Sequence, residues 1–215
     1  YLLNNDLSLI ALQGPKSVEI LEKLIQGVSK LKFMTGNNFN YDGENLYITR
    51  SGYTGEDGFE ISVPEENSES LVNFILRNDN ATLCGLGCRD SLRVEAGLSL
   101  YGNEINEDIT PIQAGLSWAL DKKRLKDSNL NGANFLLQQL QATKDNKKIG
   151  LTPINKTMLR NNMTLYNSEK EEIGYITSGC FSPILKKSIG IGYINNVSNE
   201  LDKLYVKVRG DFEEV

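Results

Sequence analysis

The chain has 215 residues, of which 40% are hydrophobic and 24% charged, a balance typical of a globular chain. A chain of this length can bury about 70% of the surface that its unfolded form exposes, so it needs neither disulfides nor metal to fold. The 28 acidic and 23 basic residues leave a net charge of −5, which argues against a nucleic-acid partner, and the absence of histidine excludes Ser-His-Asp and Cys-His catalysis and histidine-ligated metal sites. No apolar run approaches the roughly 20 residues of a membrane span, and the first residues lack the basic n-region of a signal peptide, so no membrane contact is expected.

The first part of the chain alternates between strand-like and helix-like patterns. A short apolar run at 7–12 ends at a Gln-Gly-Pro turn, and helical spacing follows at 18–25. Two alternating runs, 46–50 and 59–63, flank a glycine-rich loop and predict an antiparallel pair. A second helix is expected at about 67–76. The order β-α-β-β-α is that of a split, ferredoxin-like layer.

The pattern changes along the second part of the chain. Residues 89–98 have helical spacing, 111–119 form an amphipathic stretch, 121–127 read as a basic, solvated hinge, and a helix is expected at about 132–142. After Lys148, short β-rich runs separated by Asn, Gly, Ser and Pro predict a small antiparallel β barrel or distorted jelly roll. The fold class is therefore α+β, with a domain boundary near residue 145 that separates residues 1–145 from 146–215.

Three cysteines, Cys84, Cys88 and Cys180, have no spacing typical of a disulfide framework. The first two could supply two ligands of a metal site, but a four-ligand site would need one more group besides Cys180. We interpret them as buried or half-buried thiols in a reducing compartment, and we expect no metal.

The segment GYTGEDGFE at 52–60 is the first candidate for chemistry. Its three glycines permit a tight turn and close approach of a ligand, but it lacks the spacing of a phosphate-binding loop and its acidic residues would repel phosphate. One interpretation is a solvated acidic hairpin face. The other is a carboxylate that accepts hydrogen bonds from the amino group and ring N–H of a ligand, for which Glu60, in the strand, would be better held than Glu56 or Asp57.

The segment GLGCRDSLRVE at 85–95 is the second candidate. It lacks the third glycine of a dinucleotide fingerprint and follows no parallel strand, so a Rossmann site is not expected. Arg89 and Arg93 lie four residues apart on one helical face, and Asp90 lies near the helix start. An ion-paired surface turn and a functional cation remain open alternatives.

These segments resemble the signature segments of aminomethyltransferase, the T-protein of the glycine cleavage system. The resemblance is carried by SGYTGEDGFEI, GLGCRDSLRVEAGLSLYGNEI and TPIQAGLSWALDKKR, with ALQGP at 11–15 and GYITSGCFSPILKKSIGIGYI at 174–194 in the family's order. The KGCYxGQE-type motif of the related iron–sulfur assembly group is absent, and the demethylase and sarcosine-oxidising relatives are less similar.

The resemblance implies a transferase that moves the one-carbon unit of an aminomethyl group on the lipoyl arm of the H-protein to tetrahydrofolate, with release of ammonia. Tetrahydrofolate would be the acceptor, and the lipoyl-bearing H-protein and the other glycine cleavage components the partners. It further implies that Glu60 holds the pterin edge, that Tyr53 lines the folate pocket, and that Arg89 contacts folate or substrate, by anchoring a carboxylate or by fixing Glu60. A bacterial chain would be cytoplasmic and a eukaryotic one mitochondrial, in the matrix.

One signature segment of the family does not occur in these residues. No NGGIxDD-type segment, which supplies the family's catalytic aspartate, is found, and the sequence starts at Tyr1 rather than at Met. The resemblance therefore covers the middle and C-terminal portion of the family's chain, and we expect no catalytic residue and no activity from these residues alone. The alternatives are a folate-dependent demethylase of the same fold and a non-catalytic folate-binding module.

Overall fold

The computed structural model describes residues 6–127, 130–141, 146–195 and 203–215. The chain forms two compact units, Tyr1–Leu92 and Arg93–Val215. The predicted boundary near residue 145 falls among residues 142–145, which lie outside the described residues. Within the described ranges, no helix is long and apolar enough to cross a membrane.

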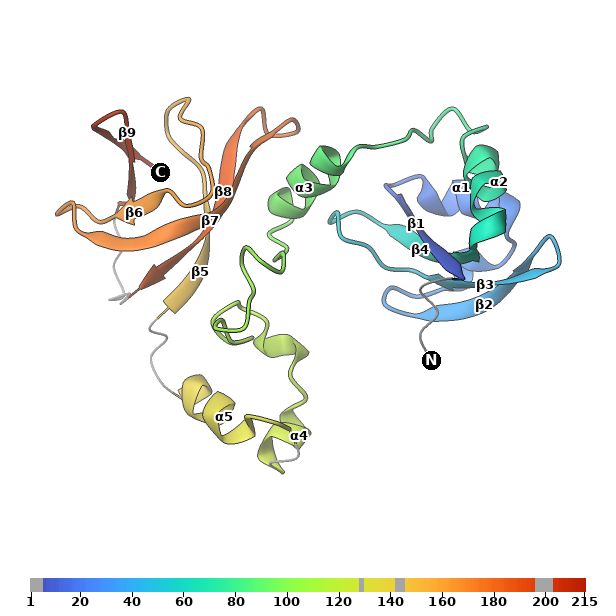
Figure 1. The fold of residues 1–215 in the computed structure, drawn as a ribbon, viewed down its shortest axis with the longest axis horizontal. Coiled ribbons are helices and arrows are strands. Elements are labelled where there is room, and N and C mark those ends of the chain that lie inside the picture. Colours follow the sequence, from blue (N-terminus) through green and yellow to red (C-terminus); the bar gives the residue numbers. More distant parts are fainter. Residues whose placement is uncertain (1–5, 128–129, 142–145, 196–202) are drawn as a thin grey trace. The chain divides into compact units, whose positions relative to one another are not determined.

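A four-stranded antiparallel sheet forms the centre of the first unit, with helices α1 and α2 on one face (Figure 1). The strand order is β1-β4-β3-β2, so the first strand pairs with the last. The strand pair predicted around the glycine-rich loop is confirmed as β3 and β4, with Ile48 opposite Ile61. The elements are β1 (Leu7–Gln13), α1 (Ser17–Leu24), β2 (Gly36–Tyr41), β3 (Glu44–Thr49), β4 (Gly58–Pro64) and α2 (Glu65–Ile75).

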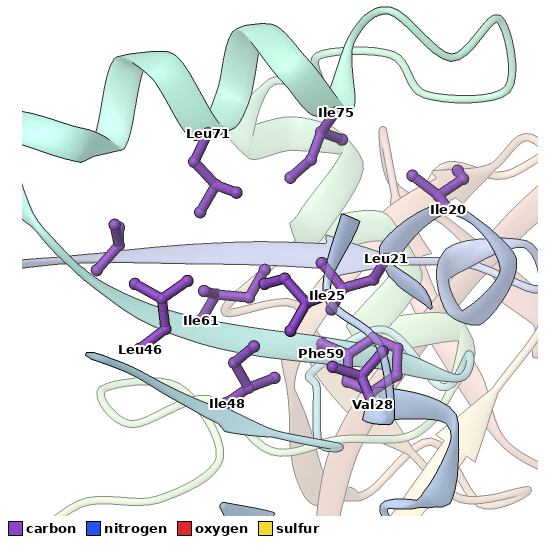
Figure 2. Close-up of a cluster of buried hydrophobic side chains, with 11 residues drawn as sticks. Ile20, Leu21, Ile25, Val28, Leu46, Ile48, Phe59, Ile61, Leu71 and Ile75 are labelled. Carbon is purple, nitrogen blue, oxygen red and sulfur yellow. The ribbon is translucent and has the colours of Figure 1, made fainter. Parts of the chain in front are cut away.

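The core of this unit lies between the sheet and the two helices, as Figure 2 shows. Strand β4 alternates strictly, so that Phe59, Ile61 and Val63 are fully buried while Glu60 and Ser62 between them are half-buried. Leu21 of α1 and Leu71 of α2 close the core from the helix side. Burial of each such side chain contributes roughly 1.5–3 kcal/mol, so this alternation fixes the register of β4 and the direction in which Glu60 points.

Strand β2 is not predicted from the sequence. Its residues, GNNFNY, are mostly polar and exposed, with only Phe39 and Tyr41 half-buried. It is an edge strand, paired only with β3 through a hairpin with Asp42 and Gly43 in left-handed conformation. An edge strand needs little apolar surface, so the alternation is confined to residues 38–41, which is too short to predict a strand.

Helices α3 to α5 connect the sheet to the C-terminal strands along the chain. The helix expected at 89–98 is α3 (Leu86–Glu95), and the one expected at 132–142 is α5 (Ala133–Gln141). The amphipathic stretch 111–119 forms turns and a short 3₁₀ helix, η2 (Ser117–Ala119).

The basic segment 121–127, expected to be a solvated hinge, is solvated, because every residue in it except Leu125 is exposed. It is a one-turn helix, α4 (Lys122–Lys126), because the Asp121 carboxylate accepts hydrogen bonds from the backbone N–H groups of Lys123 and Arg124. Leu125 is buried against a small cluster that includes Ile112 and Leu136.

The C-terminal part of the second unit is antiparallel β structure, as predicted from the short alternating runs after Lys148. Six strands form one sheet with the order β10-β9-β6-β7-β8-β5. Together with the first unit this confirms the α+β class. The strands are β5 (Asn146–Leu151), β6 (Thr164–Tyr166), β7 (Glu172–Ser182), β8 (Lys187–Asn195), β9 (Tyr205–Val208) and β10 (Asp211–Glu214).

Candidate functional site

The glycine-rich loop between β3 and β4 is closed by an ion pair. The Arg50 guanidinium donates from Nε to Asp57 Oδ1 at 2.9 Å and from Nη2 to Oδ2 at 2.6 Å, and its Nη1 donates to the Leu31 carbonyl at 2.8 Å. The hydrogen bond and charge of Arg50 lower the pKa of Asp57, and the same pair raises the pKa of Arg50. Asp57 is therefore engaged in holding the loop and is not the ligand carboxylate of this segment.

Glu60 lies on β4 directly after this loop, on the face opposite to the core. The Ser51 hydroxyl donates to Glu60 Oε2 at 2.6 Å, and the Thr49 and Ser51 hydroxyl oxygens are 2.7 Å apart. Since a serine hydroxyl has one proton, Thr49 is the donor in the second contact, and the relay runs from Thr49 to Ser51 to Glu60. Among the described residues, none donates a hydrogen bond to Glu60 Oε1. The carboxylate is thus fixed through one oxygen while the other can accept from a ligand.

Tyr53 and Arg89, which are 36 positions apart in the sequence, lie together. The Arg89 guanidinium carbon is 5.1 Å from the centroid of the half-buried Tyr53 ring, which is the geometry of a cation–π contact. Arg89 lies on α3 and is exposed, so its cation can also reach an anionic group in solvent. In the described part of the chain, Arg89 makes no hydrogen bond to Glu60. Fixing Glu60, one of the two roles expected for Arg89, is performed by Ser51 instead.

A cavity of about 720 Å³ lies within the first unit and is lined in part by Arg89, but Tyr53 and Glu60 are not among its lining residues. The residues that line it come from β1, from the turn that follows β1, from the end of α2, and from α3. Most of these lining residues are apolar. The side chains of Gln13, Thr54 and Arg89 give it polar groups on the side of the glycine-rich loop. Its volume lies in the range of about 300–1,000 Å³ that is typical of small-molecule sites.

A buried polar network in the second unit was missed by sequence reasoning. Arg93, expected to share a surface face with Arg89, is only 1% exposed, and its Nη1 donates to Glu104 Oε2 at 2.7 Å. The Thr177 and Ser178 hydroxyls donate to Glu104 Oε1 at 2.5 and 2.6 Å. The surface-turn interpretation is therefore wrong for Arg93. Glu104 carries no local pattern that distinguishes it from a solvated acid, so no sequence signal could have found this network.

The cysteines differ from the expectation of buried or half-buried thiols. Cys84 and Cys88 are exposed, and only Cys180 is half-buried. In the part of the chain that the structure describes, no three side chains of metal-ligating type come together.

Comparisons with known proteins found family models that match both parts of the chain. The model of the GCVT N-terminal domain matches residues 2–124, and that of the glycine cleavage T-protein C-terminal barrel domain matches residues 146–214. The mitochondrial aminomethyltransferase of Flaveria trinervia is 42% identical over 212 residues, which are 97% of this chain and 52% of the relative. The mitochondrial aminomethyltransferase of Homo sapiens is 42% identical over 191 residues, 88% of this chain and 47% of the relative.

A solved structure is similar over almost the whole chain. It is the crystal structure of the glycine cleavage system aminomethyltransferase T from Bartonella henselae, with a TM-score of 0.88 and 36% sequence identity, covering 97% of this chain and 57% of that one. The chain spans about half the length of the curated relatives it matches.

Proposed function

Because the chain belongs to the glycine cleavage T-protein family, we propose that it takes part in tetrahydrofolate-dependent aminomethyl transfer. The donor is an aminomethyl group carried as a thioether on the lipoyl arm of the H-protein, and the acceptor is tetrahydrofolate. The other glycine cleavage components would be its further partners. The observation that carries this proposal is Glu60, a carboxylate held through one oxygen and open at the other, in a family-matched segment.

The proposed reaction breaks two bonds of the aminomethyl carbon. Its bond to nitrogen breaks as ammonia leaves, and its bond to sulfur breaks as a dihydrolipoyl thiol forms. The carbon forms two new bonds, to the two folate nitrogens, and gives 5,10-methylenetetrahydrofolate. The two N–H protons lost by the folate balance the protons gained by ammonia and by the thiol.

The residues of this chain would bind and orient the acceptor. Glu60 Oε1 would accept hydrogen bonds from the amino group and ring N–H of the pterin, a pairing of charge and donors that suits a fixed carboxylate. The Tyr53 ring would line the folate pocket. Arg89, which stacks on that ring, would pair with a carboxylate of the folate or of the substrate. Orientation of this kind can supply several kcal/mol of the barrier reduction, because the reacting atoms are held in line.

The acid–base step would need a group that these residues do not contain. General acid–base help typically contributes 10²- to 10⁴-fold, and no NGGIxDD-type segment with its aspartate occurs in the sequence. We therefore propose that these 215 residues alone do not transfer the aminomethyl group and bind tetrahydrofolate weakly. We also propose that residues 1–145 form the folate-binding part and 146–215 the barrel, in a mitochondrial matrix if the source is eukaryotic or in a cytoplasm if it is bacterial.

Two alternatives are tested in the same experiment. The chain would be assayed for methylenetetrahydrofolate formation with lipoylated, aminomethyl-loaded H-protein, alone and joined to the aspartate-bearing portion of the Flaveria trinervia relative. Activity of the joined protein only is the expected result. Turnover with methylated nitrogen or sulfur substrates instead would identify a folate-dependent demethylase. Folate binding without turnover in either form would identify a non-catalytic folate-binding module, and equal turnover by both forms would place the catalytic groups within residues 1–215.

A further inference from the structure

Gln13, the last residue of β1, reaches into the base of the glycine-rich loop. Its Nε2 donates to the Ser51 carbonyl at 3.0 Å and to the Phe59 carbonyl at 3.2 Å, and its Oε1 accepts from the Thr54 hydroxyl at 3.2 Å. Both amide protons and one carbonyl lone pair are thereby used. One side chain thus binds the residue before the loop's first glycine, a residue within the loop, and Phe59, the second residue of β4.

Two glycines of the loop make room for this side chain. A Cβ on Gly52 would overlap the Gln13 amide oxygen, and a Cβ on Gly58 would lie 2.6 Å from Gln13 Cδ and Nε2. Neither glycine has a positive φ, so backbone conformation does not require them. For Gly52, the three atoms nearest to the added Cβ all belong to Gln13, whereas a Cβ on Gly58 would also lie 2.6 Å from the Leu12 carbonyl oxygen. Gly52 is therefore glycine because of Gln13.

The turn after Gln13 holds the far end of the same loop. The Gly14 N–H donates to the Asp57 carbonyl at 2.8 Å, and the Ser17 hydroxyl donates to the same oxygen at 3.2 Å. The loop is thus attached at its beginning, middle and end to one corner of the fold, between β1 and α1. Gln13 provides the inner attachment, where no backbone group of the corner reaches.

We propose that Gln13 is a positioning residue for the candidate site, acting on the ligand through Ser51 and Glu60. This proposal rests on the proposed function, since it assigns Gln13 to the folate site. Gln13 fixes the Ser51 backbone, and the Ser51 hydroxyl fixes Glu60 Oε2 at 2.6 Å. Loss of the Gln13 amide frees the Ser51 main chain and hence the hydroxyl that orients the carboxylate. The position of Tyr53, next to Gly52, depends on the same attachment.

A stability cycle tests the contact between Gln13 and the loop without any ligand. Gly52→Ala should lower the urea midpoint of unfolding, because the added methyl overlaps Gln13. The double variant Gln13→Ala/Gly52→Ala should unfold at a higher urea concentration than Gly52→Ala alone. Gly58→Ala is the matched control, because the Leu12 carbonyl still blocks its Cβ when Gln13 is truncated. The proposed contact would be contradicted if Gly52→Ala were as stable as the unmodified chain, or if the double variant had no higher urea midpoint than Gly52→Ala.

A binding cycle tests the positioning role. In the protein joined to the aspartate-bearing portion, Gln13→Ala should weaken tetrahydrofolate binding about tenfold by calorimetry, while exposed Gln26→Ala leaves it unchanged. In a Glu60→Gln background, Gln13→Ala should change the dissociation constant by less than about threefold, because the two residues act as one unit. Gln13→Met fills the same space without hydrogen bonds and should behave like Gln13→Ala in binding. Full additivity of the two substitutions, or unchanged affinity of Gln13→Ala, would reject the positioning role.

Amide hydrogen exchange separates this proposal from the proposed function. Residues 52–57 should exchange faster in Gln13→Ala than in the unmodified chain, while the amides of β4 beyond Glu60 stay protected. If the unmodified chain and the joined protein both fail to bind tetrahydrofolate, the proposed function is wrong and the role of Gln13 in a folate site is wrong with it. Normal folate binding with unchanged exchange in the loop would overturn the Gln13 proposal alone.

Discussion

Arg93 and Glu104 form an ion pair inside the second unit, with 2.7 Å between Nη1 and Oε2 and side-chain exposures of 2% and 0%. Among the described residues, the Glu104 carboxylate accepts four hydrogen bonds, from Arg93, the Leu100 N–H, Thr177 and Ser178. A second guanidinium nitrogen, Nη2, donates to the Ser178 hydroxyl at 2.7 Å. The pair therefore attaches α3 and the turn 98–104 to β7. Glu104 and Thr177 are 73 positions apart in the sequence, and Arg93 and Ser178 are 85 positions apart.

Removing one member of this pair should be strongly destabilising. Arg93→Met leaves the Glu104 carboxylate buried without its counter-charge, and the expected loss is about 3–5 kcal/mol of unfolding free energy. Urea unfolding, followed by signals from the C-terminal β strands, measures it. Lys23→Ala, which removes an exposed pair with Glu19 on α1, is the control and should leave the midpoint nearly unchanged. A loss for Arg93→Met no larger than for Lys23→Ala would show that the buried pair contributes nothing.

Tyr193 should titrate only in strongly alkaline solution. Its hydroxyl donates to the Glu104 carbonyl at 2.8 Å, and burial, with the nearby negative charge of Glu104, raises its pKa to about 12. The unfolded chain loses this proton near pH 10, so the stabilising contribution is complete below pH 10 and is lost as the pH rises towards 12. The absorbance of phenolate at 295 nm follows the titration of the tyrosines. The Tyr193→Phe variant should lack one tyrosine that titrates near pH 12 in the unmodified chain. Titration of that tyrosine near pH 10 would contradict its burial.

The regular features of this fold could be predicted because they repeat along the sequence. Alternation in 59–63 predicts β4, and the short runs after Lys148 predict the antiparallel strands. The edge strand β2 is not predicted because it is mostly exposed and Asn-rich, and only its last four residues alternate. Helix α4 is not predicted, because the basic residues of 121–127 favoured a solvated segment over a helix capped by Asp121.

Contacts between distant residues could not be predicted in the same way. The sequence shows that the glycines of the loop permit a tight turn and close approach of a ligand, but the partner of Gly52 and Gly58, Gln13, lies 39 and 45 positions earlier, and no periodicity links them. For Arg93 the sequence left an ion-paired surface turn and a functional cation open, because helical spacing gives a face and not its burial, and nothing in the sequence singles out Glu104. Such pairs arise only when the sheet and the turns have assembled.

The Arg50–Asp57 pair should make stability depend on pH in the acid range. Its hydrogen bonds lower the pKa of Asp57, so the contribution of the pair is present above the unfolded value near 3.9 and is lost as the pH falls through the lower folded pKa. Because Asp57 is 37% exposed on its side chain, solvent screening limits the effect to about 1 kcal/mol or less. Asp57→Asn should therefore be less stable than the unmodified chain at pH 7 and equal to it near pH 2. A difference that persists at pH 2 would show that charge is not its cause.

Glu60→Gln tests the ligand carboxylate itself. The substitution keeps the size of the side chain and can keep the Ser51 hydrogen bond through its carbonyl oxygen, but it removes the charge that would face the pterin donors. Tetrahydrofolate binding, measured by calorimetry on the protein joined to the aspartate-bearing portion, should weaken by about 1.5–3 kcal/mol, the scale of a charge-assisted hydrogen bond.

Glu56→Gln is the matched control for this substitution. Glu56 lies in the same loop four residues earlier, is exposed, and carries the same charge, so any long-range effect of net charge on folate binding would appear equally in both variants. Of these two glutamates, Glu60 is the one that has a half-buried position, an oxygen held by Ser51 and an oxygen that no described residue occupies. Equal weakening in the two variants would reduce the acidic segment to a solvated hairpin face, and unchanged affinity of Glu60→Gln with an intact fold would remove Glu60 from the site.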